Sequence, residues 1–173
     1  MSKSFLFLLV ALGAIAIIGW YGFSTLTPRI TEQTTTLEVQ PTQSTSFVVN
    51  KTAKFAIYTN GTFRVFTASM YLNLSEDVYI QGDSPNVVRV KKEGITWDDF
   101  FKTLPFKLTK DCLTTGTEET FCSGQKGTLR FYLNGIKTDD LLTREIEETD
   151  KALITYGDQS ENQIQEQINQ LDK

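Results

Sequence analysis

Residues Lys54 to Thr67 read KFAIYTNGTFRVFT, two runs of alternating apolar and polar residues on either side of Asn60-Gly61. The alternation is typical of half-buried strands, whose successive side chains point to opposite faces of a sheet. An Asn-Gly pair supplies the two positive φ angles of a type I′ turn, which fits the twist of a two-residue hairpin. The stretch therefore predicts a β-hairpin and places a sheet at the centre of the fold.

Four further runs downstream predict more strands. Val78 to Ile80 and Val87 to Val90 are short and β-rich, and the turn residues between them make a second hairpin plausible. Leu129 to Leu133 (LRFYL) precedes a second Asn-Gly pair, and Ala152 to Tyr156 (ALITY) is the last strand before Gly157.

One short helix interrupts these strands, at Thr96 to Leu104 (TWDDFFKTL). Thr96 caps it, Asp99 occupies the capping-box position and Pro105 ends it. Its four apolar side chains share one face at helical spacing; they are Trp97, Phe100, Phe101 and Leu104. An exposed aromatic binding face is one interpretation, but packing of this stripe onto the sheet is favoured.

A second helix is predicted at the C-terminus, from Ser160 to Leu171 (SENQIQEQINQL), with Ser160 and Gln163 as its capping box. Ile164, Ile168 and Leu171 form a narrow apolar stripe along it. Docking on the domain is the favoured role. A helix–helix contact with a second copy is the alternative, which makes these three residues candidate partner contacts.

The order of elements predicts an α+β fold: a mixed sheet packing one short helix over residues 53–158, then the helix of residues 159–173. This pattern resembles the β-grasp arrangement of ubiquitin-like and sulfur-carrier domains. The likeness is topological and carries no activity by itself. Because the chain lacks a Gly-Gly terminus, a carrier role is disfavoured.

Phe5 to Phe23 is the longest apolar run, and its nineteen residues contain no charge. A helix of that length spans roughly 30 Å, the hydrocarbon thickness of a bilayer. A cleaved signal peptide is the rival interpretation, because Lys3 precedes the run and Ala14-Ile15-Ala16 imitates a cleavage site. The apolar residues continue past that site to Trp20 and Tyr21, so a transmembrane anchor is favoured.

The anchor predicts a single-pass protein of the cell membrane, with residues 1–4 in the cytoplasm and the domain outside. Residues 24–52, rich in Ser and Thr, predict a stalk, although Leu37 to Val39 and Phe47 to Val49 could each form an edge strand. Three sequons favour the exterior and are candidate glycosylation sites; their asparagines are Asn50, Asn60 and Asn73.

Cys112 and Cys122 are the only two cysteines. Their spacing matches neither a C-x-x-C redox pair nor a four-thiolate zinc site. In an exterior domain a structural disulfide that closes this loop is favoured over a redox-active pair.

The residue inventory excludes several chemistries. The chain has no histidine, so His-assisted Ser or Cys catalysis and imidazole zinc sites are absent. A net charge of −4 gives no footprint for nucleic acid, and no phosphate-binding glycine loop or cofactor motif is present. Four acidic pairs read as charged surface; they are Asp98-Asp99, Glu118-Glu119, Asp139-Asp140 and Glu147-Glu148.

Three functions follow in order of preference. The first is a non-enzymatic, membrane-tethered domain that binds another envelope protein or self-associates. The second is exterior thiol–disulfide chemistry through Cys112 and Cys122. The third is a carboxylate-based glycan hydrolase that uses one acidic pair.

Several short motifs carry a family resemblance: Phe55-Ala-Ile-Tyr58 with Asn60-Gly61, Gly94-Ile-Thr-Trp-Asp-Asp-Phe-Phe101, Cys112 and Cys122, Leu133-Asn-Gly135, and Asp150 with Ile154-Thr-Tyr-Gly-Asp158 before the Gln-rich helix. With these, the chain from Asn50 onward resembles a group of small membrane-anchored proteins of unknown function from archaea and candidate-phylum microbes. Many members of that group carry H-x-H pairs suggestive of a metal site. The equivalent positions here are Asn50 and Thr52, Tyr79 and Gln81, and Arg89 and Lys91. None is histidine, so the resemblance implies no metal for this chain.

Overall fold

The computed structural model describes residues 48–124 and 126–172, which form an α+β fold with a mixed sheet and two α-helices. The predicted anchor Phe5–Phe23 and the predicted stalk up to residue 47 lie outside these residues. Within them, no helix has the length and apolar character needed to cross a membrane.

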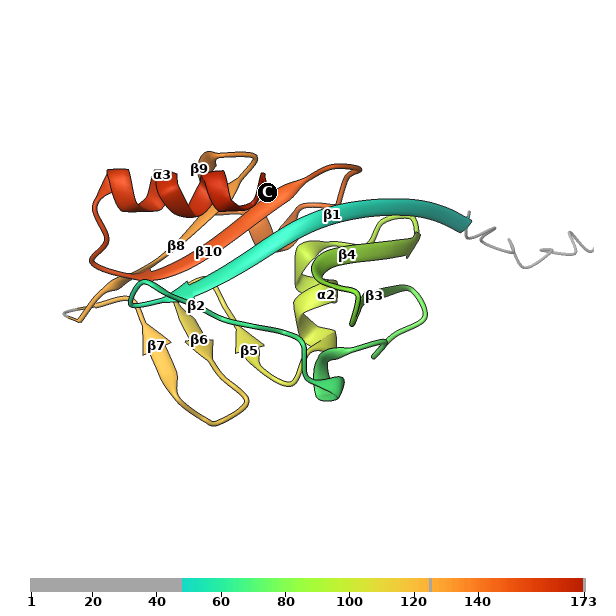
Figure 1. Ribbon diagram of the computed structural model, residues 1–173, viewed down its shortest axis with the longest axis horizontal. Helices are drawn as coiled ribbons and strands as arrows, with labels where there is room; N and C mark the ends of the chain where they lie inside the picture. The colour runs from blue at the N-terminus through green and yellow to red at the C-terminus, as the bar shows by residue number, and fades with distance from the viewer. Residues whose placement is uncertain (1–47, 125, 173) are drawn as a thin grey trace, which may run out of the picture. The chain divides into compact units, whose positions relative to one another are not determined.

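The main sheet runs in the order β3-β4-β1-β10-β8-β9, with β2 as a short extra partner of β1 (Figure 1). Its strands are β1 Val48–Thr59, β2 Thr62–Phe63, β3 Val78–Gln81, β4 Ser84–Lys92, β8 Thr128–Leu133, β9 Ile136–Thr138 and β10 Lys151–Gly157. The two central strands, β1 and β10, are parallel, and every other neighbouring pair is antiparallel. The first and last strands of the domain therefore lie at its centre.

Both Asn-Gly pairs form the predicted kind of turn. Asn60 and Gly61 have φ angles of 51° and 77°, and Asn134 and Gly135 have 53° and 80°. These turns connect β1 to β2 and β8 to β9. The first hairpin is shorter than expected, because the predicted second strand through Thr67 ends at Phe63.

On the side of β1 where β2 pairs with the end of the strand, the first half of the strand pairs with β4. β4 pairs with β1 from Val48 to Lys54, and the pairing stops before Pro85, which has no N–H to donate. β1 begins at Val48, so the last residues of the predicted stalk, up to Thr52, belong to the sheet.

Helix α2 (Trp97–Thr103) confirms the predicted start and stop. Thr96 Oγ1 accepts from the Asp99 N–H at 3.1 Å, and Asp99 Oδ2 accepts from the Thr96 N–H at 2.9 Å. The helix ends at Leu104, just before Pro105. Its aromatic stripe is buried against the sheet, as the favoured interpretation predicts; Trp97, Phe100, Phe101 and Leu104 are each at most 4% exposed.

The capping box predicts an acid dependence of stability. Hydrogen bonds from Thr96 hold the pKa of Asp99 below its usual value, so the folded state favours the carboxylate. The stabilisation is present above the unfolded pKa of about 4 and is lost as pH falls through the lower folded pKa. We expect Asp99→Asn to lower the free energy of unfolding at pH 7, and the difference from wild type to shrink in acid. Urea denaturation across pH measures this; a difference that grows on acidification would contradict it.

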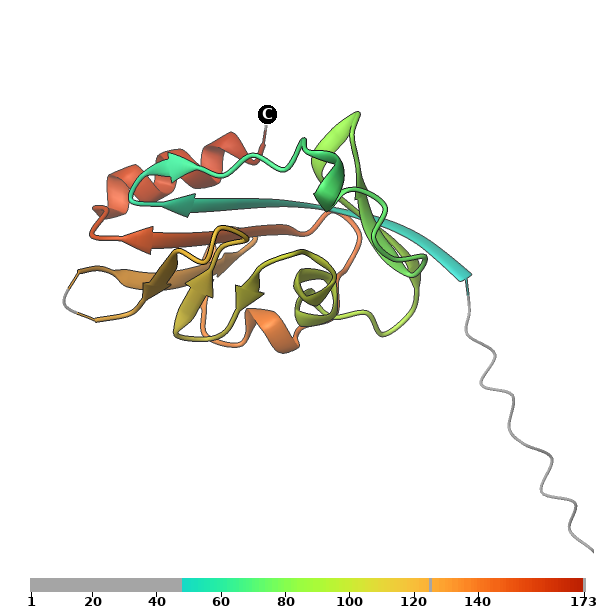
Figure 2. The ribbon, with the colours of Figure 1, turned by 90° about the horizontal axis from the view of Figure 1, so that it is seen from below.

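The main sheet is covered on both faces (Figure 2), and an apolar cluster lies on each side. One face of β1 and β10 packs against α2 in a large cluster, which we call the α2-side core. The other face packs against helix α3 (Glu161–Gln170) in a smaller cluster, the α3-side core. The alternation along β1 explains both, since Phe55 and Ile57 face α2 while Ala56 and Tyr58 face α3.

A second, three-stranded sheet lies on the α2 side (Figure 1). Its strands are β5 Lys107–Leu108, β6 Cys112–Thr114 and β7 Thr120–Cys122. Leu113 and Phe121 point into the α2-side core, so this small sheet extends the cover that α2 provides.

Candidate functional site

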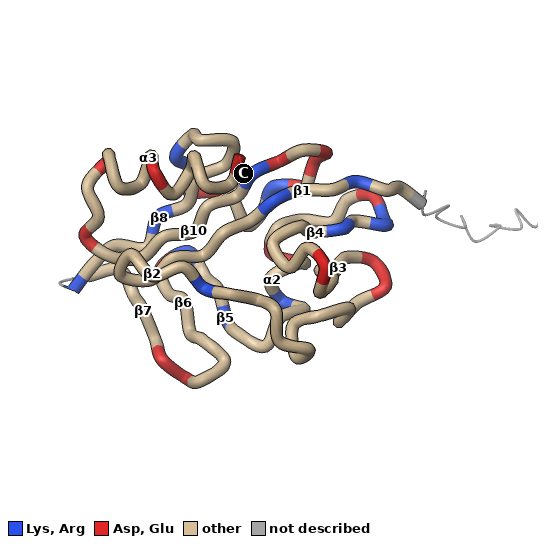
Figure 3. The backbone as a smooth tube through the Cα atoms, viewed as in Figure 1, with Lys and Arg blue, Asp and Glu red and all other residues tan. Residues whose placement is uncertain are grey.

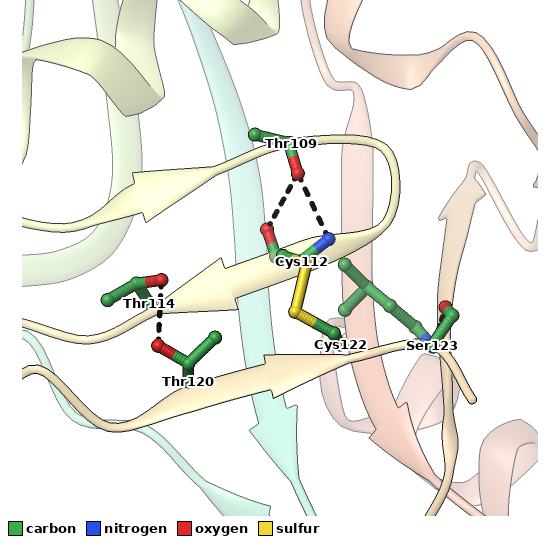
Figure 4. The surroundings of a disulfide bond; sticks show 7 residues. Thr109, Cys112, Thr114, Thr120, Cys122 and Ser123 are labelled. Carbon is green, nitrogen blue, oxygen red and sulfur yellow. Dashed lines mark hydrogen bonds between the residues drawn. A yellow bond between two sulfur atoms is a disulfide. The ribbon is translucent and has the colours of Figure 1, made fainter. Parts of the chain in front are cut away.

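Cys112 and Cys122 are directly opposite each other on β6 and β7, at disulfide distance as predicted (Figure 4). Their Cα atoms are 4.1 Å apart. Thr109 Oγ1 accepts from the Cys112 N–H at 3.0 Å, which fixes the turn before β6. Cys122 is exposed, so reductants reach the bond from solvent.

The three sequon asparagines are all exposed but differ in their contacts. Asn50 Oδ1 accepts from Lys91 Nζ at 2.6 Å, and Asn60 lies in the β1–β2 turn. Asn73 has a positive φ of 52° in the loop before β3. Attachment of sugars at these positions stays a prediction.

The predicted partner-contact residues lie on the inner face of α3. Ile164 and Leu171 are 1% and 7% exposed in the α3-side core, and Ile168 is partly buried against it. Tyr58 donates toward Gln170 beneath the helix, and burial raises the pKa of this tyrosine. The stripe is thus occupied by docking on the domain, the favoured interpretation.

The acidic pairs lie apart in the sequence, and at least one carboxylate of each pair meets a nearby cation. Asp98 pairs with Lys102, Glu119 Oε2 is 3.5 Å from an Arg64 nitrogen, Asp140 pairs with Arg144 at 3.0 Å, and Glu147 pairs with Lys51 at 2.9 Å. Across residues 48–124 and 126–172, no three His, Cys, Asp or Glu side chains come together to hold a metal. Charges of both signs are interspersed over the domain (Figure 3).

The six positions that the family resemblance associates with H-x-H pairs are spread along the neighbouring strands β1, β4 and β3. Thr52 and Tyr79 are the register partners of Arg89 on its two sides, and Asn50 bonds Lys91. Two cations at the centre of such a surface repel a metal ion. These residues therefore do not fit a metal site.

An apolar cavity lies elsewhere, between the segment that follows β2 and the small sheet. This cavity of about 350 Å³, here called the apolar groove, is open to solvent. Its apolar lining consists of Ile57, Phe63, Val65, Phe66, Met70, Tyr71, Phe106 and Leu113. Val65 and Met70 are 58% and 51% exposed, and they are two of the four large apolar side chains that are exposed among the described residues.

Threonines and one arginine form the polar rim of the groove. Thr62, Thr115 and Thr117 line it, together with Arg64. Arg64 Nε donates to Thr59 Oγ1 at 2.6 Å, and its guanidinium carbon lies 5.4 Å from the centre of the Phe121 ring. The arginine thus connects β1 to β7 and fixes one end of the groove.

A close backbone approach fixes the other side. A Cβ atom at Gly116 would lie 2.9 Å from the Pro105 carbonyl oxygen, so only glycine lets the β6–β7 turn approach the end of α2. The lining includes no carboxylate, cysteine or lysine. The groove offers apolar surface and neutral hydrogen-bonding groups, which suits binding rather than acid–base catalysis.

The sequence interpretation missed this groove, because its residues come from the ends of β1 and β2, the loop before β3 and the small sheet. The signal in the sequence is the apolar residues after Phe63, whose alternation predicts a strand. No protein-family model, curated protein or solved structure matches the chain.

Proposed function

We propose that this chain is a non-catalytic binding protein, tethered to the membrane through Phe5–Phe23, whose exterior domain binds another envelope protein in the apolar groove. The observation that carries the proposal is the exposure of Val65 and Met70 beside a preformed apolar cavity. Exposed apolar surface costs solubility and is typical of interaction sites.

The strand order supports assigning the domain to the β-grasp arrangement. β4-β1-β10-β8-β9 has its first and last strands parallel at the centre, with α2 crossing one face between the two hairpins. β2, β3, the small sheet and α3 are additions to that arrangement. This topology is shared by proteins that bind other proteins and by proteins of other functions, so it is compatible with the proposal without carrying it.

The lining defines the chemistry of the partner. Aromatic and aliphatic walls select an apolar side chain, and Met70 is flexible enough to adapt to its shape. The threonine hydroxyls and Arg64 can bond the main chain or polar neighbours of the inserted residue. The expected partner is a protein segment that presents one or two bulky apolar side chains between polar residues.

Site-specific crosslinking tests the groove. A photoreactive residue at Met70 in the full chain, expressed in its own cells, should give one recurrent covalent adduct. The matched control is the same residue at Asn162, exposed on α3 and outside the groove. Val65→Asp, which charges the groove without touching the core, should abolish the Met70 adduct and leave the thermal unfolding midpoint unchanged.

Two outcomes would contradict the proposal: equal adducts at both positions, or an adduct that survives Val65→Asp. The tether has its own test, since protease added to intact cells should remove the domain. Protection of the domain would place it inside the cell and refute the exterior location separately from the groove.

The exposed position of Cys122 favours thiol–disulfide chemistry as a second candidate. A reduction potential below about −300 mV would identify the bond as structural and exclude that role. The acidic pairs are dispersed over the domain, so they give the glycan hydrolase no comparable support. Membership of the group of small membrane-anchored proteins is likewise part of the proposal.

A further inference from the structure

Two Asn-Gly turns in this domain have nearly identical φ angles but different side-chain surroundings. The φ angles of Asn60 and Gly61 match those of Asn134 and Gly135 to within a few degrees. Both asparagines are exposed. Any difference in their chemistry must therefore arise from what holds each side chain.

The Asn134 side chain is fixed at both ends. Its Nδ2 donates to Asp150 Oδ1 at 2.8 Å, and its Oδ1 accepts from the Lys151 N–H at 2.9 Å. Asp150 is only 7% exposed, and its other oxygen accepts from the Glu147 N–H at 3.0 Å. The asparagine amide is thus part of a partly buried network that connects the turn to the start of β10.

The Asn60 side chain has no hydrogen bond to any residue in the described part of the chain. Its main-chain N–H donates to the Tyr156 carbonyl at 2.7 Å, which fixes the backbone but leaves the amide group in solvent. Apart from Asn60, Gly61 and Thr62, no described residue lies within 4 Å of the position that a Cβ atom would take on Gly61, whereas Ile168 is at 3.8 Å from the equivalent point on Gly135. No described residue outside the turn therefore packs against the outer side of Gly61, and no hydrogen bond holds the Asn60 amide away from the Gly61 nitrogen.

We propose that Asn60 is a site of spontaneous deamidation and isoaspartate formation, and that the hydrogen bonds of Asn134 protect the second turn. Hydroxide removes the Gly61 amide proton, and the nitrogen attacks Cγ of Asn60. The new N–Cγ bond closes a five-membered succinimide, the Cγ–Nδ2 bond breaks, and ammonia leaves with a proton from water. No atom changes oxidation state.

Water then opens the ring at either of its two carbonyl carbons. Addition at Cγ gives aspartate with the normal main chain. Addition at the main-chain carbonyl gives isoaspartate, which lengthens the turn by one backbone carbon. A two-residue I′ turn has no room for that carbon, so the isoaspartyl form loosens the pairs Tyr58–Phe63 and Thr59–Thr62. These pairs hold the wall of the apolar groove, but the modification itself does not depend on the proposed function.

The test is incubation of the folded full chain at mildly alkaline pH in ¹⁸O-labelled water, followed by mass spectrometry of tryptic peptides. Cleavage after Lys54 and Arg64 isolates Asn60, and cleavage after Arg130 and Lys137 isolates Asn134. Since release of Asn134 requires breaking two hydrogen bonds, its conversion should be slower by about tenfold or more. In the denatured chain the two rates should converge.

A variant that opens the network supplies the second readout. Asp150→Ala removes the acceptor for Asn134 Nδ2 and should raise the Asn134 rate while leaving the Asn60 rate unchanged. If that variant fails to fold, the comparison of folded and denatured wild type still decides. Equal rates at the two sites in the folded protein, or faster conversion at Asn134, would overturn the proposal.

Discussion

Phe55→Ala will lower the free energy of unfolding by about 3–5 kcal/mol, the largest effect expected of a single core substitution here. Phe55 is fully buried at the centre of β1. Its ring centre lies 5.1 Å from those of Phe66 and Phe100 and 6.0 Å from that of Phe101. Truncation removes buried apolar area and leaves a cavity between the sheet and α2, because three rings cannot collapse into the space together.

Urea denaturation followed by circular dichroism measures this effect, and two variants bracket it. Val65→Ala truncates an exposed side chain and should change stability by less than about 0.5 kcal/mol. Phe55→Leu keeps most of the side-chain volume, so its loss of unfolding free energy should fall between those of Val65→Ala and Phe55→Ala. A loss for Phe55→Ala no larger than that for Val65→Ala would refute the packing described for the α2-side core.

Removing both cysteines should cost about 3 kcal/mol, the chain-entropy value for a loop of this length. The sequence separation of Cys112 and Cys122 is 10 residues. The double variant Cys112→Ala, Cys122→Ala leaves Leu113 and Phe121 in place, so the effect reports the bond and not the core. Since folded domains are stable by only about 5–15 kcal/mol, such a loss is readily measured.

The control for this prediction uses a reductant. Wild type with reductant should match the double variant, and the double variant itself should not respond to reductant. Two free thiols in the oxidised, exported wild-type protein would show that the disulfide does not form. Exposure of Cys122 ensures that accessibility does not limit the experiment.

Local chemistry accounts for the parts of the fold that the sequence predicts well. Asn60-Gly61 and Asn134-Gly135 specify their turns because few other residues accept positive φ angles. The caps at Thr96 and Ser160 are equally local, since each bonds a residue three positions later. These signals are read within a few residues and need no knowledge of the rest of the chain.

The small sheet and the length of β2 depend on distant contacts and could not be read in this way. β5 has two residues and β6 and β7 have three each, too few for a periodic signal. Val65 continues the alternating pattern of a strand, yet β2 pairs only with Tyr58 and Thr59, and β4 takes over the same side of β1 from Lys54 back to Val48. The apolar groove exists because that pairing stops early.

The parallel pair at the centre of the sheet has a mechanical consequence. β1 starts at Val48, and β10 ends at Gly157 at the opposite end of the pair, with six residue pairs in register between them. A force that pulls these two points apart acts along the strands and loads the connecting hydrogen bonds together in shear, rather than one after another as in unzipping. A domain held at Val48 and pulled from beyond β10 would therefore resist tension through the whole β1–β10 pair at once.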